Sequence, residues 1–234
     1  MQTPTKRPNE NPLTDLLTTI RSGDNYDYDD IVVRLTDAAA GKTSVTADEA
    51  DMMCEIAEAL TDGFNAKTGH SPVEAGIAML CNVYFPQDYT VRIANVMTRC
   101  MKKENAQKCA DRLETRIDGR FYLNSMELCA VSGASGRLAA IAPFYKACAQ
   151  SEIAPYVCED LRDTLDMMPP DIGLYAEQMA CGLGFLSYFA ASKDEDVADE
   201  AKECLRRHLK SNFAREQENP SVAKQIADVK KRLE

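Results

Sequence analysis

Long apolar runs are absent from this chain of 234 residues. The longest strongly apolar stretch without a charged residue covers residues 179–191, and it is too short to cross a bilayer. The first twelve residues are polar and rich in proline, so we expect no secretory signal there. These absences predict an intracellular, cytoplasmic protein without a membrane span.

A surplus of basic charge is also missing. Lys and Arg number 27 against 37 Asp and Glu, which gives a formal net charge of -10. Because the phosphates of nucleic acids attract a basic surface, we do not expect general nucleic-acid binding. The hydrophobic fraction of 45% is ordinary for a globular protein, and the chain is long enough to bury a sizeable core.

Signatures of metal binding and catalysis are scarce. The two histidines, His70 and His208, lack the Glu-x-x-His spacing of di-iron bundles, and the nine cysteines include no Cys-x-x-Cys pair. An odd number of cysteines without a secretory signal fits reduced thiols that act as small buried hydrophobes. We therefore predict no cofactor, no metal and no catalytic residue. His208 is expected to be a structural residue beside a buried stripe. That stripe consists of Val197, Ala201, Cys204 and Leu205.

Helical periodicity extends along nearly the whole chain, and strand-like alternation over more than four residues is hard to find. The pattern predicts an all-α protein of about twelve helices, grouped in triplets of roughly 50 residues. Two architectures fit this pattern. One is a HEAT/armadillo-like α-solenoid, and the other is an irregular helical bundle.

Several helix ends have clear sequence signals. Thr46-Ala47-Asp48-Glu49 is a capping box, and Pro169-Pro170 is expected to end a later helix. Gly119 is predicted to end one helix, and a new one is predicted to begin at Asn124. The first two helices are expected near 12–22 and 28–40. The last three are expected at 171–191, 196–211 and 220–233.

The cysteines suggest an internal repeat. Cys81, Cys100 and Cys109 are spaced almost like Cys129, Cys148 and Cys158, and residues 71–118 share ten identities with residues 119–166 when the two are aligned without gaps. Successive core helices of an irregular bundle would explain the likeness equally well. We expect a flexible polar segment over residues 1–11 and a single helical domain over 12–234.

Charge is segregated along the chain. Residues 101–150 contain eight basic and five acidic side chains, whereas residues 151–189 contain one basic and seven acidic ones. The segregation defines a basic stripe and an acidic stripe as candidate partner-binding sites. The basic stripe is Lys108, Arg112 and Arg116, and the acidic stripe is Glu159, Asp163 and Asp166. Alternatively, both stripes are ordinary solvated helix faces, paired with each other or with water.

The hypothesis that follows is a non-enzymatic helical-repeat protein, a scaffold or adaptor that binds another protein or peptide through this charge-segregated surface. The alternative is a compact bundle with an apolar pocket that acts as a small-molecule sensor or an enzyme. Gly182 and Gly184 lie in the most apolar stretch, where they permit close helix approach or leave room for a ligand. The C-terminal helix at 220–233 either docks in cis or mediates homodimerisation.

Overall fold

The structure is a computed structural model of the chain that describes seven ranges of residues. They are 12–22, 45–62, 87–101, 119–130, 135–169, 175–210 and 219–234. The chain divides into two compact units, Met1–Pro86 and Gln87–Glu234. Within the described ranges we find nine α-helices, one 3-10 helix and no strand, which confirms the all-α class. The helices predicted near 28–40 and in most of the first repeat copy lie outside these ranges.

The first unit contains α1 (Pro12–Ser22) and α3 (Ala47–Asp62), which pack against each other. The capping box at the start of α3 is confirmed. The backbone N–H of Thr46 donates to Oε2 of Glu49 at 3.0 Å, and the N–H of Glu49 donates to Oγ1 of Thr46 at 3.3 Å. The apolar face of each helix is buried, with Leu16 on α1 and Met53 on α3 both 0% exposed.

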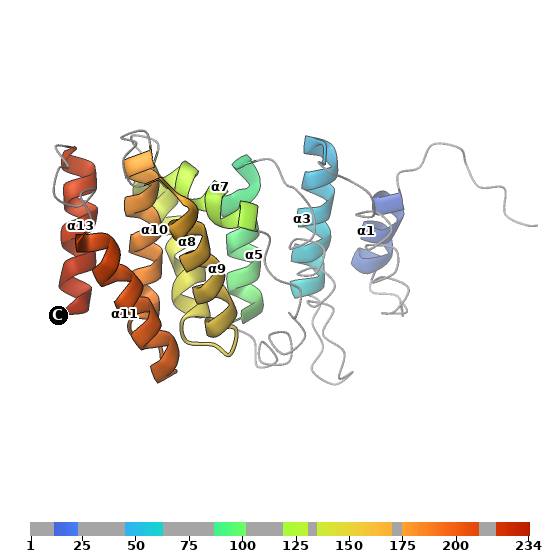
Figure 1. The fold of residues 1–234 in the computed structure, drawn as a ribbon. Helices are drawn as coiled ribbons and strands as arrows, with labels where there is room; N and C mark the ends of the chain where they lie inside the picture. Colours follow the sequence, from blue (N-terminus) through green and yellow to red (C-terminus); the bar gives the residue numbers. More distant parts are fainter. Residues whose placement is uncertain are drawn as a thin grey trace, which may run out of the picture. The chain divides into compact units, whose positions relative to one another are not determined.

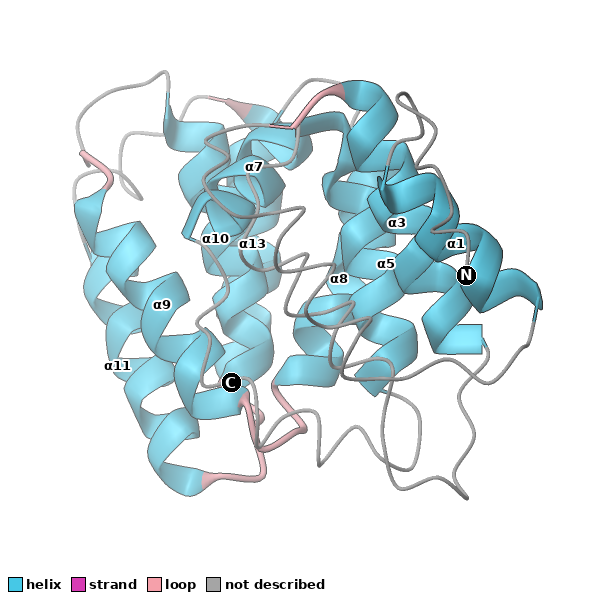
Figure 2. Ribbon diagram, turned by 90° about the vertical axis from the view of Figure 1, so that its right-hand side faces the viewer, coloured by secondary structure: helices cyan, strands magenta, loops and turns pink. Residues whose placement is uncertain are grey.

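The second unit contains the 3-10 helix η1 (Gln87–Tyr89) and seven α-helices. These are α5 (Thr90–Met101), α7 (Gly119–Ala130), α8 (Ser135–Cys148), α9 (Ala154–Met167), α10 (Ala176–Phe189), α11 (Glu195–Lys210) and α13 (Pro220–Leu233). The helix contacts arrange them in two rows (Figures 1 and 2). In one row α5 packs on α8, α8 on α10 and α10 on α13; in the other, α7 packs on α9 and α9 on α11. From α7 to α11, successive helices therefore alternate between the rows.

Helix α10 lies at the centre of this unit, because it contacts α7, α8, α9, α11 and α13. Its sequence is apolar on nearly every side, as expected for a helix surrounded by others. A Cβ atom added at Gly182 would lie 2.7 Å from Cδ2 of Leu165 and 2.9 Å from Cε of Met126. Glycine at this position therefore allows α9 and α7 to approach closely, and side chains occupy the room that a ligand would need. A Cβ at Gly184 meets nothing within 4 Å.

Helix α7 begins earlier than predicted. The structure starts it at Gly119, so the prediction that Gly119 ends a helix and Asn124 starts the next is wrong. Ser125 lies inside the helix, where its hydroxyl donates to the carbonyl oxygen of Phe121 at 2.7 Å instead of capping a new helix. The earlier start places Tyr122 and Met126 on one buried face, and both are 0% exposed.

Helix α13 docks in cis on α10. Its buried residues are Val222, Ile226 and Val229. Asn219 caps the helix by accepting from the N–H of Ser221 at 2.9 Å, and its side-chain amide donates to Glu177 at 2.6 Å. The apolar face of α13 is thus covered by α10 within the chain, and homodimerisation through this helix stays a prediction. No helix in the described ranges is both long and apolar enough to cross a membrane.

Candidate functional site

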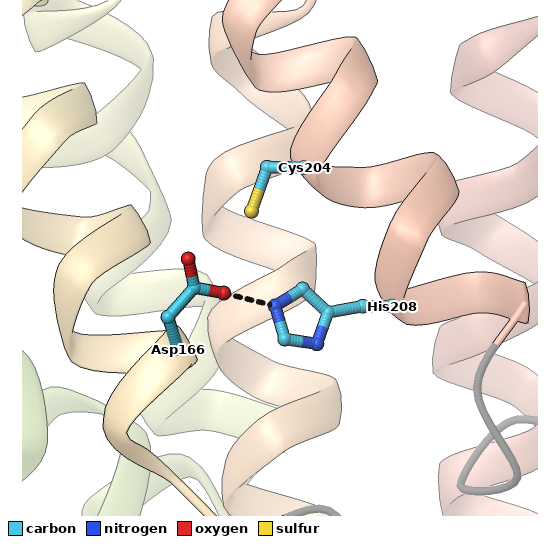
Figure 3. Close-up of side chains that lie close together, drawn as sticks. All are labelled: Asp166, Cys204 and His208. Carbon is cyan, nitrogen blue, oxygen red and sulfur yellow. Dashed lines mark hydrogen bonds and ion pairs between the residues drawn. The ribbon is translucent and has the colours of Figure 1, made fainter.

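The candidate site lies where the last turn of α9 meets the C-terminal half of α11. Cys204 and His208 are four residues apart on α11, so their side chains lie one above the other on the same face of the helix. Asp166 projects toward them from α9, and helices α9 and α11 pack against each other. Figure 3 shows the three side chains converging between the two helices.

Asp166 is the centre of this cluster. His208 Nε2 donates to Asp166 Oδ1 at 2.9 Å. Nη2 of Arg207 donates to both oxygens of the same carboxylate, at 2.7 Å and 2.5 Å. The same Nη2 lies 3.6 Å from Sγ of Cys204. One ligand atom each from Asp166, Cys204 and His208 lie within 4.8 Å of one another.

The members of the cluster differ in their access to solvent. The side chain of Asp166 is 41% exposed and that of His208 is 13% exposed, whereas Cys204 is buried. Burial raises the pKa of the Cys204 thiol, and the negative charge of Asp166 adds to that increase while Arg207 opposes it. Asp166 in turn raises the pKa of Arg207 above its ordinary value. The resting state is therefore a protonated thiol beside an ion pair.

The geometry does not favour a Cys-His nucleophile. Catalysis of that kind needs one imidazole nitrogen facing the sulfur and the other facing an orienting carboxylate. Here Nε2 faces Asp166, and the other ring nitrogen points to the side of the ring away from Cys204 (Figure 3). The protonated thiol also lacks the lowered pKa that activates a cysteine. Carboxylate, imidazole and thiol instead present their donor atoms to one shared point.

The acidic stripe predicted on α9 is exposed, but its members have different surroundings. Asp166 is paired with Arg207 and His208 on α11. Glu159 and Asp163 are exposed, and neither has a hydrogen bond or ion pair with another described residue. The basic stripe of Lys108, Arg112 and Arg116 lies outside the described residues. Whether the two stripes share a face therefore stays a prediction.

Two large apolar side chains on α9 are exposed next to these carboxylates. Tyr156 is 55% exposed and Met167 is 76% exposed. At 3.6 residues per turn, the positions 156, 159, 163 and 167 fall within about 80° of one another around the helix. We call this set, Tyr156, Glu159, Asp163 and Met167, the α9 face.

The sequence alone did not reveal the Asp166 cluster. The spacing of Cys204 and His208 was visible, and the structure confirms that His208 lies beside the buried stripe of α11. The third residue of the cluster, Asp166, lies on another helix, 38 residues before Cys204. No local signal in the sequence predicts that α9 packs on α11. Comparison with known proteins adds no assignment, because no family model, no curated protein and no solved structure matches the chain.

Proposed function

We propose that the chain is a non-enzymatic helical-repeat protein that binds a basic segment of another protein through the α9 face. The observation that carries this proposal is the exposure of Tyr156 and Met167 on either side of two carboxylates that lack a partner among the described residues. The function is that of a scaffold or adaptor in a reducing, cytoplasmic environment. Buried cysteine thiols in successive helices support that environment.

The composition of the α9 face suits a protein partner. Tyrosine is enriched among the residues that contribute most to interfaces, and methionine adapts its shape to irregular apolar surfaces. Met167 comes eleven positions after Tyr156, which corresponds to about 16 Å along the helix at 1.5 Å per residue. A partner helix of about three turns would contact both apolar side chains.

The negative charge of the α9 face favours partners with basic side chains. Glu159 and Asp163 lie between the two apolar side chains, and both are exposed. A partner with Lys or Arg between two apolar residues complements this pattern, whereas an acidic partner is repelled. Tyr156 also offers an aromatic ring to a cationic side chain.

The two-row arrangement of the second unit supports a helical repeat. Helices α7 to α11 alternate between the rows, and a stack of helix pairs is the construction principle of α-solenoids. In this interpretation the repeating unit is a pair of helices in place of the predicted triplet, and the HEAT/armadillo-like α-solenoid fits better than the irregular bundle. Stacked helices would then present the α9 face as part of an extended surface.

The test is affinity capture of partners at native expression, with quantitative comparison between two double variants of the full chain. Glu159→Lys with Asp163→Lys reverses the α9 face. Glu203→Lys with Asp228→Lys is the matched control, because it changes the same charge at exposed positions of α11 and α13. Both variants must retain the thermal unfolding curve of the parent chain.

We expect the α9 variant to capture about a tenth, or less, of the principal basic partner that the parent chain captures. The control variant should capture as much of it as the parent chain. Binding to the parent chain should weaken as salt concentration rises, because the contact is electrostatic and exposed. Capture of the same partners by both variants would contradict the proposal, and so would a principal partner that carries an acidic segment.

A further inference from the structure

The cluster at the end of α9 combines three ligand types that zinc accepts. Zinc binds cysteine thiolate, imidazole nitrogen and carboxylate oxygen, at about 2.3 Å, 2.0 to 2.1 Å and 2.0 to 2.2 Å, respectively. In a tetrahedral site these bond lengths place neighbouring ligand atoms about 3.3 to 3.6 Å apart. The donor atoms of Asp166, Cys204 and His208 already lie within 4.8 Å of one another, and Nε2 of His208 is 2.9 Å from Asp166 Oδ1.

We propose that Asp166, Cys204 and His208 bind a zinc ion that joins α9 to α11. The donor atoms of all three residues converge between the helices (Figure 3). Nη2 of Arg207 lies beside them, 2.7 Å and 2.5 Å from the oxygens of Asp166 and 3.6 Å from Sγ of Cys204. Small rotations of the side chains, of about 1 Å at the donor atoms, bring the ligand atoms to tetrahedral spacing. The fourth position is filled by a water molecule, since Asp166 opens the site to solvent.

Arg207 marks the place of the cation. Its guanidinium donates to both oxygens of Asp166 and approaches Sγ of Cys204, so it supplies positive charge to two of the three ligands. The side chain of Arg207 is 59% exposed, which allows it to turn into solvent when an ion takes its place. Arg207 thus competes with the metal for Asp166.

Binding changes bonds in a balanced way. The S–H bond of Cys204 breaks and a Zn–S bond forms, while the thiol proton passes to water or buffer. The hydrogen bonds from Arg207 and His208 to Asp166 are replaced by Zn–O and Zn–N bonds. The proton on Nε2 of His208 leaves that nitrogen: a neutral ring takes up a proton at Nδ1 in exchange, and an imidazolium releases one net proton to solvent. No electron is transferred.

The test is titration of the full chain with zinc against a chromophoric chelator, under reducing conditions. We expect one ion per chain to bind, and bound zinc to raise the midpoint of thermal unfolding, because an ion that binds the folded state stabilises it. Cobalt in place of zinc should produce a sulfur-to-metal charge-transfer absorption together with the intense visible bands of a tetrahedral ion. These bands identify thiolate in the site.

Single substitutions identify the ligands. Cys204→Ala and His208→Gln should each weaken zinc binding by more than the roughly 10- to 100-fold that loss of an outer partner costs at metal sites. His70→Gln and Cys129→Ala are the matched controls, since the first removes the other histidine and the second removes a buried thiol on α7. Both controls should bind zinc like the parent chain.

Arg207→Gln gives the most specific result. Removing the competing cation should tighten zinc binding by about two- to fivefold, the effect expected from an exposed ion pair. The proposal is overturned if the parent chain binds no stoichiometric zinc, or if binding survives both His208→Gln and Cys204→Ala. If Cys204→Ala does not fold, the test rests on His208→Gln, which changes a partly exposed side chain. Zinc binding by His208→Gln equal to that of the parent chain then overturns the proposal.

Discussion

Two helix pairs of the second unit pack in different ways. Helix α13 covers α10 with Val222, Ile226 and Val229. Its polar contacts lie at the two ends of the helix and at Gln225, whose Oε1 accepts from Sγ of Cys181 at 3.4 Å. Helix α11 also buries an apolar face, but ion pairs join it to α9 along the length of the contact, from Arg162–Glu200 to Arg207–Asp166. The comparison separates an interface that mainly stabilises the fold from one whose charges stay accessible to ligands.

The ends of α13 show how polar groups secure an apolar interface. Nη1 of Arg232 donates to Oγ of Ser187 at 2.6 Å and to the carbonyl oxygen of Gly184 at 3.2 Å. The same guanidinium lies over the ring of Tyr188, with its central carbon 4.6 Å from the ring centroid. The guanidinium of Arg232 therefore interacts with groups of α10 in the same chain. At the α9–α11 contact, the side chains of Arg207 and Asp166 are 59% and 41% exposed.

Alkaline pH should unfold both helix pairs, and this is the largest effect that we expect. Burial raises the pKa of Cys129, Cys158 and Cys181 to about 12, from the ordinary thiol value near 9. Above pH 9 the unfolded chain loses these protons while the folded chain keeps them. The folded state therefore binds more protons, and the free energy of unfolding falls as pH rises from about 9 to 12.

Far-UV circular dichroism across this pH range measures the effect, and we expect cooperative loss of the helical signal before pH 12. Cys158 belongs to the α9–α11 pair and Cys181 to the α10–α13 pair. Cys158→Ala and Cys181→Ala should each make the pH dependence less steep. A helical signal that stays constant up to pH 12 would show that burial does not hold these thiols protonated.

Truncation of the α13 interface should produce the next largest effect. Ile226 is 5% exposed, and Ile226→Ala is expected to lower the free energy of unfolding by about 2 to 4 kcal/mol through lost burial and a residual cavity. Lys224→Ala, at an exposed position of the same helix, is the control and should change it by less than about 0.5 kcal/mol. Urea unfolding measures both, and equal losses would place α13 outside the cooperative core.

Loss of the ion pair at α9 should have the smallest effect. In the presence of a metal chelator, Arg207→Gln is expected to lower the free energy of unfolding by at most about 1 kcal/mol, because both partners are exposed. The loss should shrink at high salt, since ions screen an exposed pair. A loss as large as that of Ile226→Ala, independent of salt, would remove the distinction between the two interfaces.

Local chemistry allowed parts of the fold to be predicted from the sequence. The capping box of Thr46 and Glu49 and the helix beginning at Pro220 depend on contacts within four residues, and the structure confirms both. Pro169 follows α9, as predicted, because proline cannot continue a helix. Gly119 misled the prediction, since glycine occurs at both ends of helices.

The candidate sites depend on contacts that no local pattern encodes. Exposure of Glu159 and Asp163 followed from helical periodicity, and the structure agrees with it. The pairing of Asp166 with Arg207 did not, because it requires α9 and α11 to pack in one particular register. Likewise, the apolar stretch around Gly182 suggested either close packing or a cavity. The positions of Leu165 and Met126 decide for close packing at that residue.

The buried cysteines can report the local opening of individual helices in this fold. Each of the five successive helices α7 to α11 contains one buried cysteine, namely Cys129, Cys148, Cys158, Cys181 and Cys204. A thiol reagent reaches such a residue only when the helix around it opens, so the rate of modification at each position reports the free energy of local opening. The chain therefore contains a reporter in every helix of this series, and one mass-spectrometric time course would rank the helices from first to last to open.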